Sequence, residues 1–324
     1  MLVTGANGYV GKAVVDLLLQ LGVPVRAMVR SEANAADLRL PGVEIVLGEL
    51  RDRASLDRAV AGISGIFHIA AIFRQAGFPE EVFFDINANG TRNLFEAAIA
   101  AGVKRIVHCS TGGVLGHVSQ PPGNENSPYN PGDMYQRSKL AGEKIAMEYF
   151  RSGKIGGVVI RPAMIYGPGD TRHLKLFKTI AHRKFIFIGD GKTHAHFVDV
   201  RDLAKAFILA MEKEDCNAQI YHIPGERAVP LKEVVNLIAD YTNVPRPKLH
   251  IPAKPVQLLG SLCEAVCAPL KISPPIYRRR VDFFTKNRHF DGSKAARELG
   301  YKPAKPFESE LREVVDWYKQ NNWL

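Results

Sequence analysis

A glycine-rich turn near the start of the chain limits its fold more than any other feature. Leu2-Val3-Thr4 has the composition of a short strand, and the apolar spacing over Ala13 to Leu21 predicts a helix. The turn between them is Gly5-Ala6-Asn7-Gly8-Tyr9-Val10-Gly11. Its first glycine permits a tight turn, its second lets the backbone approach a pyrophosphate, and its third lets the helix pack closely on the strand. This order predicts a dinucleotide site, with the pyrophosphate at the helix N-terminus.

Apolar runs further along the chain alternate between strand and helix character. Strands are predicted at Val25 to Val29, Val43 to Leu47, Gly65 to Ile69, Arg105 to Cys109 and Gly157 to Arg161, with helices at Ser55 to Val60, Gly90 to Ala100 and Lys139 to Phe150. Such alternation is typical of a parallel sheet with helices on both faces. We therefore predict an α/β fold with a Rossmann-type doubly wound parallel sheet, in which ligands bind at the carboxyl ends of the strands.

The character of the sequence changes after Gly167-Pro168-Gly169, where a more irregular, Pro-rich stretch follows at 224–275. This part of the chain predicts a smaller α/β substrate-binding cap. We expect the NAD(P)-binding Rossmann domain and the cap to interleave along the chain. The expected division is 1–165 plus about 196–223 for the nucleotide domain, and 166–195 plus 224–324 for the cap.

The composition excludes several classes of protein. An excess of 43 Lys and Arg over 33 Asp and Glu gives a net charge of +10, which suits an anionic cofactor or substrate, or an acidic membrane surface. Zinc-finger spacing and basic runs with interleaved aromatics are absent from the sequence, so we predict no nucleic-acid partner. Four cysteines without paired spacing favour a cytoplasmic location. His194 and His196 alternate on a predicted strand, but two ligands are too few, and we predict no metal.

Tyr135 and Lys139 form the strongest chemical signal in the chain. They lie four residues apart in a predicted helix and therefore project from one face. An ammonium beside a phenol favours the tyrosinate, so we expect the pKa of Tyr135 to fall from about 10 toward physiological pH. Tyr135 is then a candidate general acid and base. Transfer of a hydride to a ketone builds negative charge on the oxygen, and such chemistry needs a proton donor beside a second hydrogen-bond donor.

With the glycine turn, this pair resembles the extended short-chain dehydrogenase/reductases, which include the nucleotide-sugar epimerases and dehydratases. The closest branch in character is that of the 3β-hydroxysteroid dehydrogenases and dihydroflavonol reductases. The resemblance covers nearly the whole chain, and its matching pieces are Thr4 to Gly11, His68 to Ala71, Asn87 to Asn93, Cys109 to Thr111, Tyr135 to Lys139, Arg161 to Gly169 and Asp291 to Lys294. It implies an NAD(P)-dependent enzyme of the epimerase/dehydratase family.

The resemblance also implies roles for single residues. Thr111 stands where the family has its second hydrogen-bond donor, with Ser110 as the neighbouring alternative. The implied catalytic residues are thus Thr111, Tyr135 and Lys139, and Lys139 would also hold the nicotinamide ribose. The residues implied in cofactor binding are Gly5, Asn7, Gly8, Tyr9, Val10, Gly11, Arg30, Ser31, Glu49, Leu50, Ile69, Ala70, Ala71, Asn87, Ser110, Tyr135, Lys139, Pro162 and Ile165. Asn87 has an alternative interpretation as the N-cap of the helix that follows it.

The phosphate preference of the cofactor depends on the end of the second strand, which lies beside the ribose 2′ position. An acidic residue there suits a free hydroxyl, whereas an arginine suits a 2′-phosphate. This chain has Val29-Arg30-Ser31, so Arg30 can make charge-assisted hydrogen bonds to a phosphate. We expect NADP in preference to NAD. Glu32 nearby leaves open a contact with an unphosphorylated ribose.

The substrate is less well defined by the sequence. Nucleotide-sugar epimerases place a diphosphate-binding arginine where Ala195 stands in this chain. Arg280 aligns roughly with a second arginine of that kind, and Phe73, Arg172 and Arg280 are our expected substrate contacts. The apolar segment Leu258 to Leu270, followed by Arg278-Arg279-Arg280, resembles the cap of steroid and lipid-ketone reductases. It suits an apolar substrate or, through 258–280, peripheral contact with an anionic membrane.

The sequence therefore predicts an oxidoreductase that moves a hydride between a nicotinamide cofactor and a carbonyl or secondary alcohol. The expected small-molecule substrate is steroid-like, flavonoid-like or a 3-oxoacyl compound. A nucleotide-sugar epimerase or dehydratase, acting through a transient keto-sugar, is the alternative. A third hypothesis is a cofactor-sensing protein. The presence of Thr111, Tyr135 and Lys139 argues against it, because a sensor needs none of them. The family resemblance makes a homodimer the expected assembly.

Overall fold

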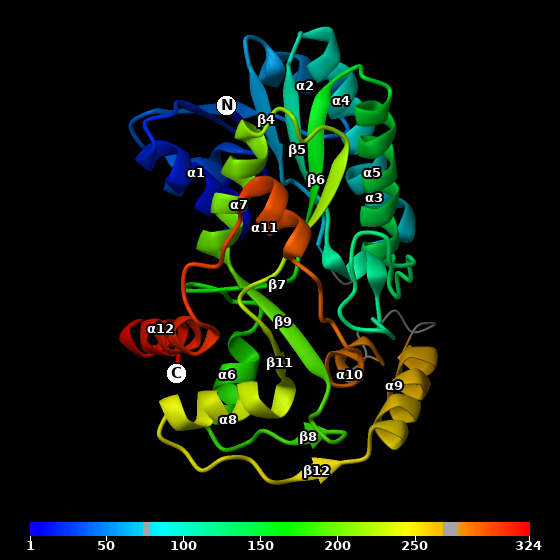
Figure 1. Ribbon diagram of the computed structural model, residues 1–324, viewed down its shortest axis with the longest axis vertical. Coiled ribbons are helices and arrows are strands. Elements are labelled where there is room, and N and C mark those ends of the chain that lie inside the picture. Colours follow the sequence, from blue (N-terminus) through cyan, green and yellow to red (C-terminus); the bar gives the residue numbers. More distant parts are fainter. Residues whose placement is uncertain (74–77, 268–277) are drawn as a thin grey trace.

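A seven-stranded parallel sheet forms the centre of the larger domain (Figure 1). The computed structural model describes residues 1–73, 78–267 and 278–324. The sheet has the order β10-β6-β5-β4-β1-β2-β3, and each neighbouring pair is parallel. Its strands are β1 (Leu2–Thr4), β2 (Val25–Val29), β3 (Val43–Leu47), β4 (Gly65–His68), β5 (Arg105–Cys109), β6 (Gly156–Pro162) and β10 (Gln219–Ile223). The order reverses between β1 and β4, which is where an open α/β sheet binds its ligand.

Helices cover both faces of this sheet because successive strand residues point to opposite sides. Phe67 and Val107 face one core, whereas the adjacent Ile66 and Ile106 face the other. The first core is closed by α1 (Tyr9–Gln20), α7 (Val200–Glu212) and α11 (Ser293–Leu299), and the second by α2 (Arg53–Val60), α4 (Gly90–Ala100) and α5 (Met134–Arg151). Shorter helical turns are η1 (Glu32–Leu38), α3 (Glu80–Phe84), η2 (Asp85–Asn89) and η3 (Gly112–Leu115).

The cap has its own sheets and its own core. A three-stranded sheet has the order β11-β9-β7, and a two-stranded one pairs β12 with β8. Its strands are β7 (Met164–Tyr166), β8 (Phe187–Ile188), β9 (His194–Asp199), β11 (Ala228–Pro230) and β12 (His250–Ile251). Its helices are α6 (Leu174–Ala181), α8 (Leu231–Tyr241), α9 (Ala253–Cys267), α10 (Arg278–Thr285) and α12 (Phe307–Gln320). Apolar faces of α6, α8 and α12 meet in one buried cluster that includes Phe177, Ile238 and Val314.

The predicted fold class is confirmed by this architecture. The strands at 25–29, 43–47 and 105–109 and the helix at 90–100 have the predicted bounds, while α1 and α5 begin at Tyr9 and Met134, earlier than predicted. The division into 1–165 plus about 196–223 and 166–195 plus 224–324 stays a prediction. Within the part assigned to the cap, however, α11 packs on β10 and α7 of the nucleotide domain. No helix among the described residues is long and apolar enough to cross a membrane.

A buried carboxyl group at the start of α12 predicts a pH-dependent stability. The Tyr166 hydroxyl donates to Glu310 at 2.8 Å, and burial, more than the nearby acidic residues, raises the pKa of Glu310 to about 8. The folded chain therefore keeps a proton that the unfolded chain loses near its reference pKa of about 4.3, so stability falls as the pH rises from about 5 to about 8.

We expect Glu310→Gln to remove this fall in unfolding free energy with rising pH. Glutamine keeps an acceptor for the Tyr166 hydroxyl. The gain in unfolding free energy should be smallest at pH 5 and reach about 1–2 kcal/mol at pH 8. Urea unfolding at several pH values measures it, with Asp316→Asn on the exposed face of α12 as the control. An unchanged pH slope in Glu310→Gln would contradict the assignment.

Candidate active site

Lys139 lies in the second turn of α5, and its side chain joins this helix to the end of β5. Its side chain is buried, and Nζ donates to the Cys109 carbonyl oxygen at 2.6 Å. Burial lowers the pKa of Lys139, and the nearby Cys109 and Glu143 oppose this effect. Asp133 caps the helix by accepting from Gln136 N at 2.8 Å. These contacts fix the turn that carries Tyr135, four residues before Lys139 and on the same face.

Thr111 and Ser110 follow β5 but have different surroundings. The Ser110 hydroxyl is buried and donates to Glu143 Oε2 at 2.5 Å. Thr111 is only partly buried, and its Oγ1 accepts from Gly113 N at 3.1 Å, which leaves its own proton free to be donated. A Cβ at Gly113 would lie 3.2 Å from Thr111 Oγ1 and 3.1 Å from Gln136 Nε2. Thr111 is therefore next to the first turn of α5, which carries Tyr135, and it is better placed than Ser110 to act as the predicted second hydrogen-bond donor.

Phe73, an expected substrate contact, stands against Tyr135. Their ring centroids are 4.9 Å apart with the rings edge to face, and Phe73 is 45% exposed. The residues that follow Phe73, 74–77, are outside the described part of the chain. An exposed aromatic ring therefore places an apolar surface beside the proposed proton donor.

Asn87 connects the end of β4 to α5 and is not a helix N-cap. It lies within the π-helical turn η2, where its side chain accepts from Ile72 N at 2.9 Å and donates to the Ile72 carbonyl and to Ser138 Oγ. A Cβ on Gly142 would lie 2.1 Å from the Asn87 carbonyl oxygen, so only glycine allows this approach of η2 to α5. Such π-turns inside helices are frequent at functional sites. The N-cap alternative is therefore wrong.

The glycine turn has the geometry that a pyrophosphate needs. Gly5 has a φ of +68°, and a Cβ there would lie 2.8 Å from the Ala70 Cα, so β1 and β4 meet closely at this turn. Gly8 is the N-cap of α1 and has no side chain to occupy the first helical N–H groups. Those groups and the helix dipole are suited to an anion. Asn7 beside them is exposed, while Val10 is buried in the core beneath.

His68 joins the end of β4 to the end of β1 through a hydrogen bond to Thr4. Thr4 Oγ1 accepts from the amides of Ile69 and Ala70 at 3.1 Å each, so its proton goes to His68 Nδ1 at 2.9 Å. Nε2 then carries the ring proton toward Thr91 at 3.1 Å. Burial, followed by the charge of Lys139, lowers the pKa of His68 to about 3. The imidazole is therefore neutral, which agrees with a role in shaping the site.

Tyr9 and Arg172 connect the glycine turn to the end of β7. The Tyr9 hydroxyl donates to the Pro168 carbonyl at 3.1 Å, and the Arg172 guanidinium lies 4.8 Å from the Tyr9 ring centroid. Arg172 also donates to Asp170 at 2.6 Å and to the Ile165 carbonyl at 3.0 Å. A substrate contact of Arg172 would have to compete with these bonds, so its predicted role is weakened.

The remaining predicted cofactor residues border the same edge of the sheet. Arg30 and Ser31 are exposed after β2, whereas Glu32 is paired with Arg39 at 2.5 Å. Glu49 is half-buried, and Leu50 is buried against Gly90. Ala71 follows β4 by three residues, Pro162 ends β6, and Ile165 lies within β7. Arg280 lies in α10, but its side chain is outside the part that the structure describes.

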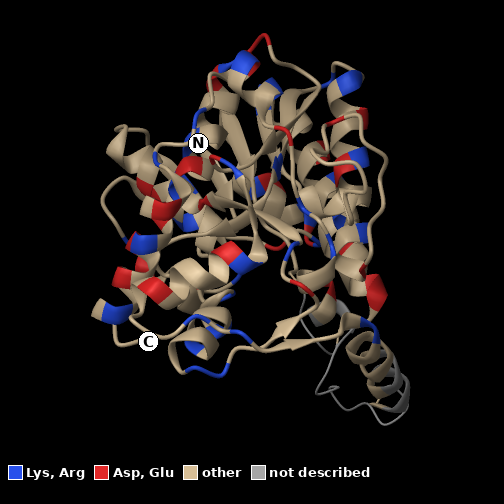
Figure 2. Cartoon of the chain, turned by 60° about the horizontal axis from the view of Figure 1, so that its bottom comes forward, with Lys and Arg blue, Asp and Glu red and all other residues tan. Residues whose placement is uncertain are grey.

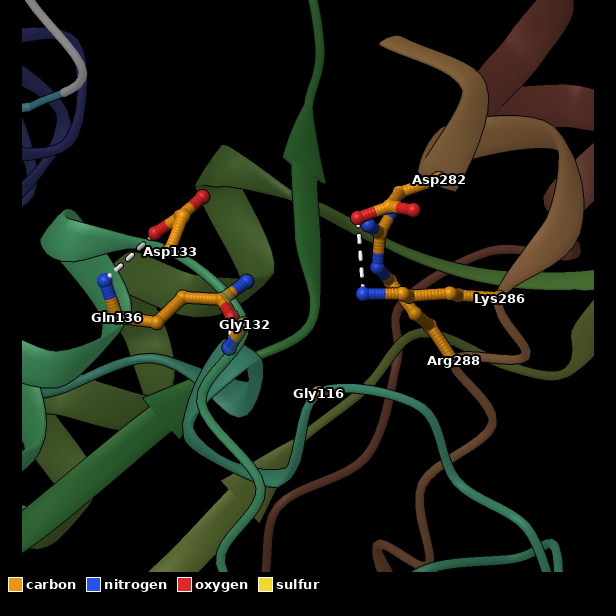
Figure 3. Close-up of a pocket in the computed structure, with 7 residues that line it drawn as sticks. All are labelled: Gly116, Gly132, Asp133, Gln136, Asp282, Lys286 and Arg288. Carbon is orange, nitrogen blue, oxygen red and sulfur yellow. Dashed lines mark hydrogen bonds and ion pairs between the residues drawn. The ribbon is translucent and has the colours of Figure 1, made fainter. Parts of the chain in front are cut away.

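A small pocket opens beside the first turn of α5 (Figure 3). Lys286 and Arg288 reach it from the strand-like segment after α10, and Lys286 is paired with Asp282 at 2.8 Å. Its lining residues are Gly116, Gly132, Asp133, Gln136, Asp282, Lys286 and Arg288. Sequence reasoning missed these two cations, as well as the buried pair of Glu143 and Arg161 behind Ser110. The sequence held one signal for Glu143. It follows Tyr135 and Lys139 at four-residue spacing, which places it on the same face of the helix.

A parallel sheet of this order with a glycine turn after its first strand is that of a Rossmann-type dinucleotide-binding protein. The chain belongs to the NAD-dependent epimerase/dehydratase family, whose model matches residues 1–223. This match confirms the predicted family and the prediction of an NAD(P)-dependent oxidoreductase.

Similar proteins come from several functional groups. The chain is 32% identical to sterol demethylase protein B of Methylococcus capsulatus, over 100% of this chain and 99% of that protein. It is 28% identical to 2-alkyl-3-oxoalkanoate reductase of Stenotrophomonas maltophilia, over 97% and 98% of the two chains. The crystal structure of DesIV, a dTDP-glucose 4,6-dehydratase from Streptomyces venezuelae with NAD and TYD bound, has a TM-score of 0.79 and 27% identity, over 99% and 97% of the chains.

Lys139→Met tests whether this lysine is retained for function at a cost in stability. Because burial lowers its pKa, the charged side chain is disfavoured in the folded state, and methionine removes that penalty. We expect the variant to gain about 1 kcal/mol of stability and to lose turnover by about a hundredfold or more. Thermal unfolding without cofactor and steady-state rates measure the two effects, with the exposed Lys154→Met as the control. A lower melting temperature would mean that the bond to Cys109 outweighs the burial penalty.

Proposed function

We propose that the chain is an NADP-preferring reductase of ketones on apolar small molecules. The observation that carries the proposal is the position of the exposed Phe73 ring against Tyr135. A nicotinamide cofactor, when bound, supplies the hydride. The residues present fit it, because the Gly5 turn and the uncapped first turn of α1 form a cradle for the pyrophosphate.

The chain's own groups manage the charge that develops on the carbonyl oxygen. Tyr135 donates its phenolic proton to this oxygen, and Thr111 donates a second hydrogen bond. Lys139 would hold the nicotinamide ribose hydroxyls of a bound cofactor and, as a cation, would stabilise the tyrosinate that remains. In the reverse direction Tyr135 takes the proton from an alcohol. Asn87 and Ser138 keep α5 in position during both steps.

An apolar substrate is supported by several features of the chain. Leu258 and Leu259 on α9 are 64% and 56% exposed. Figure 2 shows few charged residues on the described part of this helix, and its sequence holds only Lys254 and Glu264. Ala195, where epimerases have a diphosphate-binding arginine, is buried in the cap core. The names of the similar sterol demethylase protein B and 2-alkyl-3-oxoalkanoate reductase are consistent with lipid-like substrates.

The alternative, a nucleotide-sugar epimerase or dehydratase, is favoured by one observation. Lys286 and Arg288 stand in the pocket beside α5, where cations would suit a diphosphate. Asp282 pairs with Lys286 and opposes that use. Peripheral membrane contact through 258–280 and a homodimer stay predictions, which vesicle co-sedimentation and analytical ultracentrifugation would test.

A ligand panel tests the substrate class. With NADPH present, we expect steroid-like or 3-oxoacyl ketones to raise the melting temperature and to be reduced, whereas UDP- and dTDP-sugars do neither. Phe73→Ala should raise KM for the ketone about tenfold, because it loses about 1.5 kcal/mol of aromatic contact, and should leave KM for NADPH unchanged. Stabilisation and turnover with a nucleotide sugar but no ketone would favour the epimerase.

Arg30→Ala tests the cofactor preference. Loss of charge-assisted hydrogen bonds of about 1.5 kcal/mol or more should weaken NADPH binding at least tenfold and leave NADH binding unchanged. Fluorescence titration of both cofactors measures this, and Arg58→Ala, an exposed arginine on α2, is the control. Tighter binding of NADH than NADPH by the wild-type protein would contradict the preference.

A further inference from the structure

A buried ion pair lies directly behind the proposed catalytic residues. Arg161 on β6 and Glu143 on α5 have side chains that are 0% and 1% exposed. They are joined by two hydrogen bonds, from Nη2 to Oε1 at 2.5 Å and from Nε to Oε2 at 3.0 Å. Burying two charges is costly unless their remaining hydrogen-bonding groups are also satisfied. The partners that satisfy them therefore indicate what the pair connects.

These partners come from different segments around the site. Glu143 accepts from the Ser110 hydroxyl, directly before Thr111. The Tyr129 hydroxyl donates to Glu143 Oε1 at 3.1 Å and accepts from Arg161 Nη2 at 2.9 Å. His222 on β10 lies 3.5 Å from Arg161 Nη1. One pair of charges thus connects β5, β6, β10, α5 and the loop at 116–133, which leads into the turn carrying Tyr135.

Tyr129 is the outermost member of this cluster. The residue is 43% exposed, and its ring centroid lies 5.1 Å from the Arg161 guanidinium and 5.8 Å from Lys144 Nζ. The next residue, Asn130, donates from its backbone to the Val114 carbonyl at 2.9 Å, which brings the loop onto η3 after Thr111. The loop is therefore held at one point by the Tyr129 hydroxyl and at the next by η3. Along the chain, Tyr129 and Asn130 both lie between Thr111 and Tyr135.

We propose that Tyr129 is a positioning residue that fastens the 116–133 loop to the Glu143 and Arg161 pair and so holds Tyr135 in register with Thr111. The inference rests on the proposed function, in which these two side chains act on one oxygen. Tyr129 touches neither substrate nor cofactor in this account. Its loss should lower kcat, because misplacement of a catalytic group by about 1 Å costs up to about a hundredfold.

Tyr129→Phe is the direct test, since it keeps the ring and removes only the hydroxyl. Tyr149→Phe is the matched control. The Tyr149 hydroxyl, on α5, makes a similar 3.1 Å hydrogen bond to Glu96 on α4. We expect Tyr129→Phe to lower kcat for the ketone about tenfold with KM for NADPH within twofold. Hydrogen exchange should accelerate in the peptide that spans 129–138. Tyr149→Phe should change neither kcat nor exchange in that peptide.

Two further results separate a positioning role from a merely structural one. Ser110→Ala, which cuts the cluster on its Thr111 side, should also lower kcat, and the double variant should lose less than the product of the two single losses. Unchanged kcat in a folded Tyr129→Phe, or exchange that does not accelerate, would overturn the proposal. If the wild-type protein reduces no ketone, the proposed function is wrong, and hydrogen exchange alone then decides whether Tyr129 fastens the loop.

Discussion

The hydrogen bond from Lys139 to the Cys109 carbonyl is the contact on which the proposed site depends. It places a cation in a buried position at the end of β5, where burial lowers its pKa and the neutral Cys109 carbonyl accepts its hydrogen bond. A fold selected for stability alone would place an apolar side chain there. The ammonium is better explained by its neighbours, because Tyr135 lies one turn earlier on the same helix and Thr111 lies two residues after Cys109.

A continuous chain of hydrogen bonds joins the cofactor cradle to this helix. It begins at Thr4 beside the glycine turn, passes through His68 and Thr91, and reaches the Asn87 carbonyl. The Asn87 side chain then bonds to Ser138 on α5. Each group in the chain is buried and has a defined donor or acceptor role, so the geometry is rigid. In the proposed site, the same contacts would therefore set the position of a bound dinucleotide and the position of Tyr135.

Local patterns in the sequence were sufficient for the sheet, the glycine turn and the catalytic spacing. Strands such as 43–47 and 105–109 are short apolar runs between turns, and the Tyr135 and Lys139 pair needs only helical periodicity. The sequence could not place Arg161 against Glu143, Tyr9 against Pro168, or Asn87 within a π-turn, because each partner lies far along the chain or depends on backbone packing. Arg172 has the charge that an anionic substrate needs, and only the structure reveals Asp170 and Ile165 as its partners.

The central claim is that Tyr135 exchanges a proton with the substrate beside a bound hydride donor. Its most direct test is the single-turnover rate of Tyr135→Phe with saturating NADPH and a ketone that the wild-type protein reduces. A general acid contributes about a hundredfold to ten-thousandfold, so the rate at saturating NADPH should fall by at least about a hundredfold while the protein stays folded. A Tyr135→Phe variant that reduces the ketone within twofold of the wild-type rate would contradict the account.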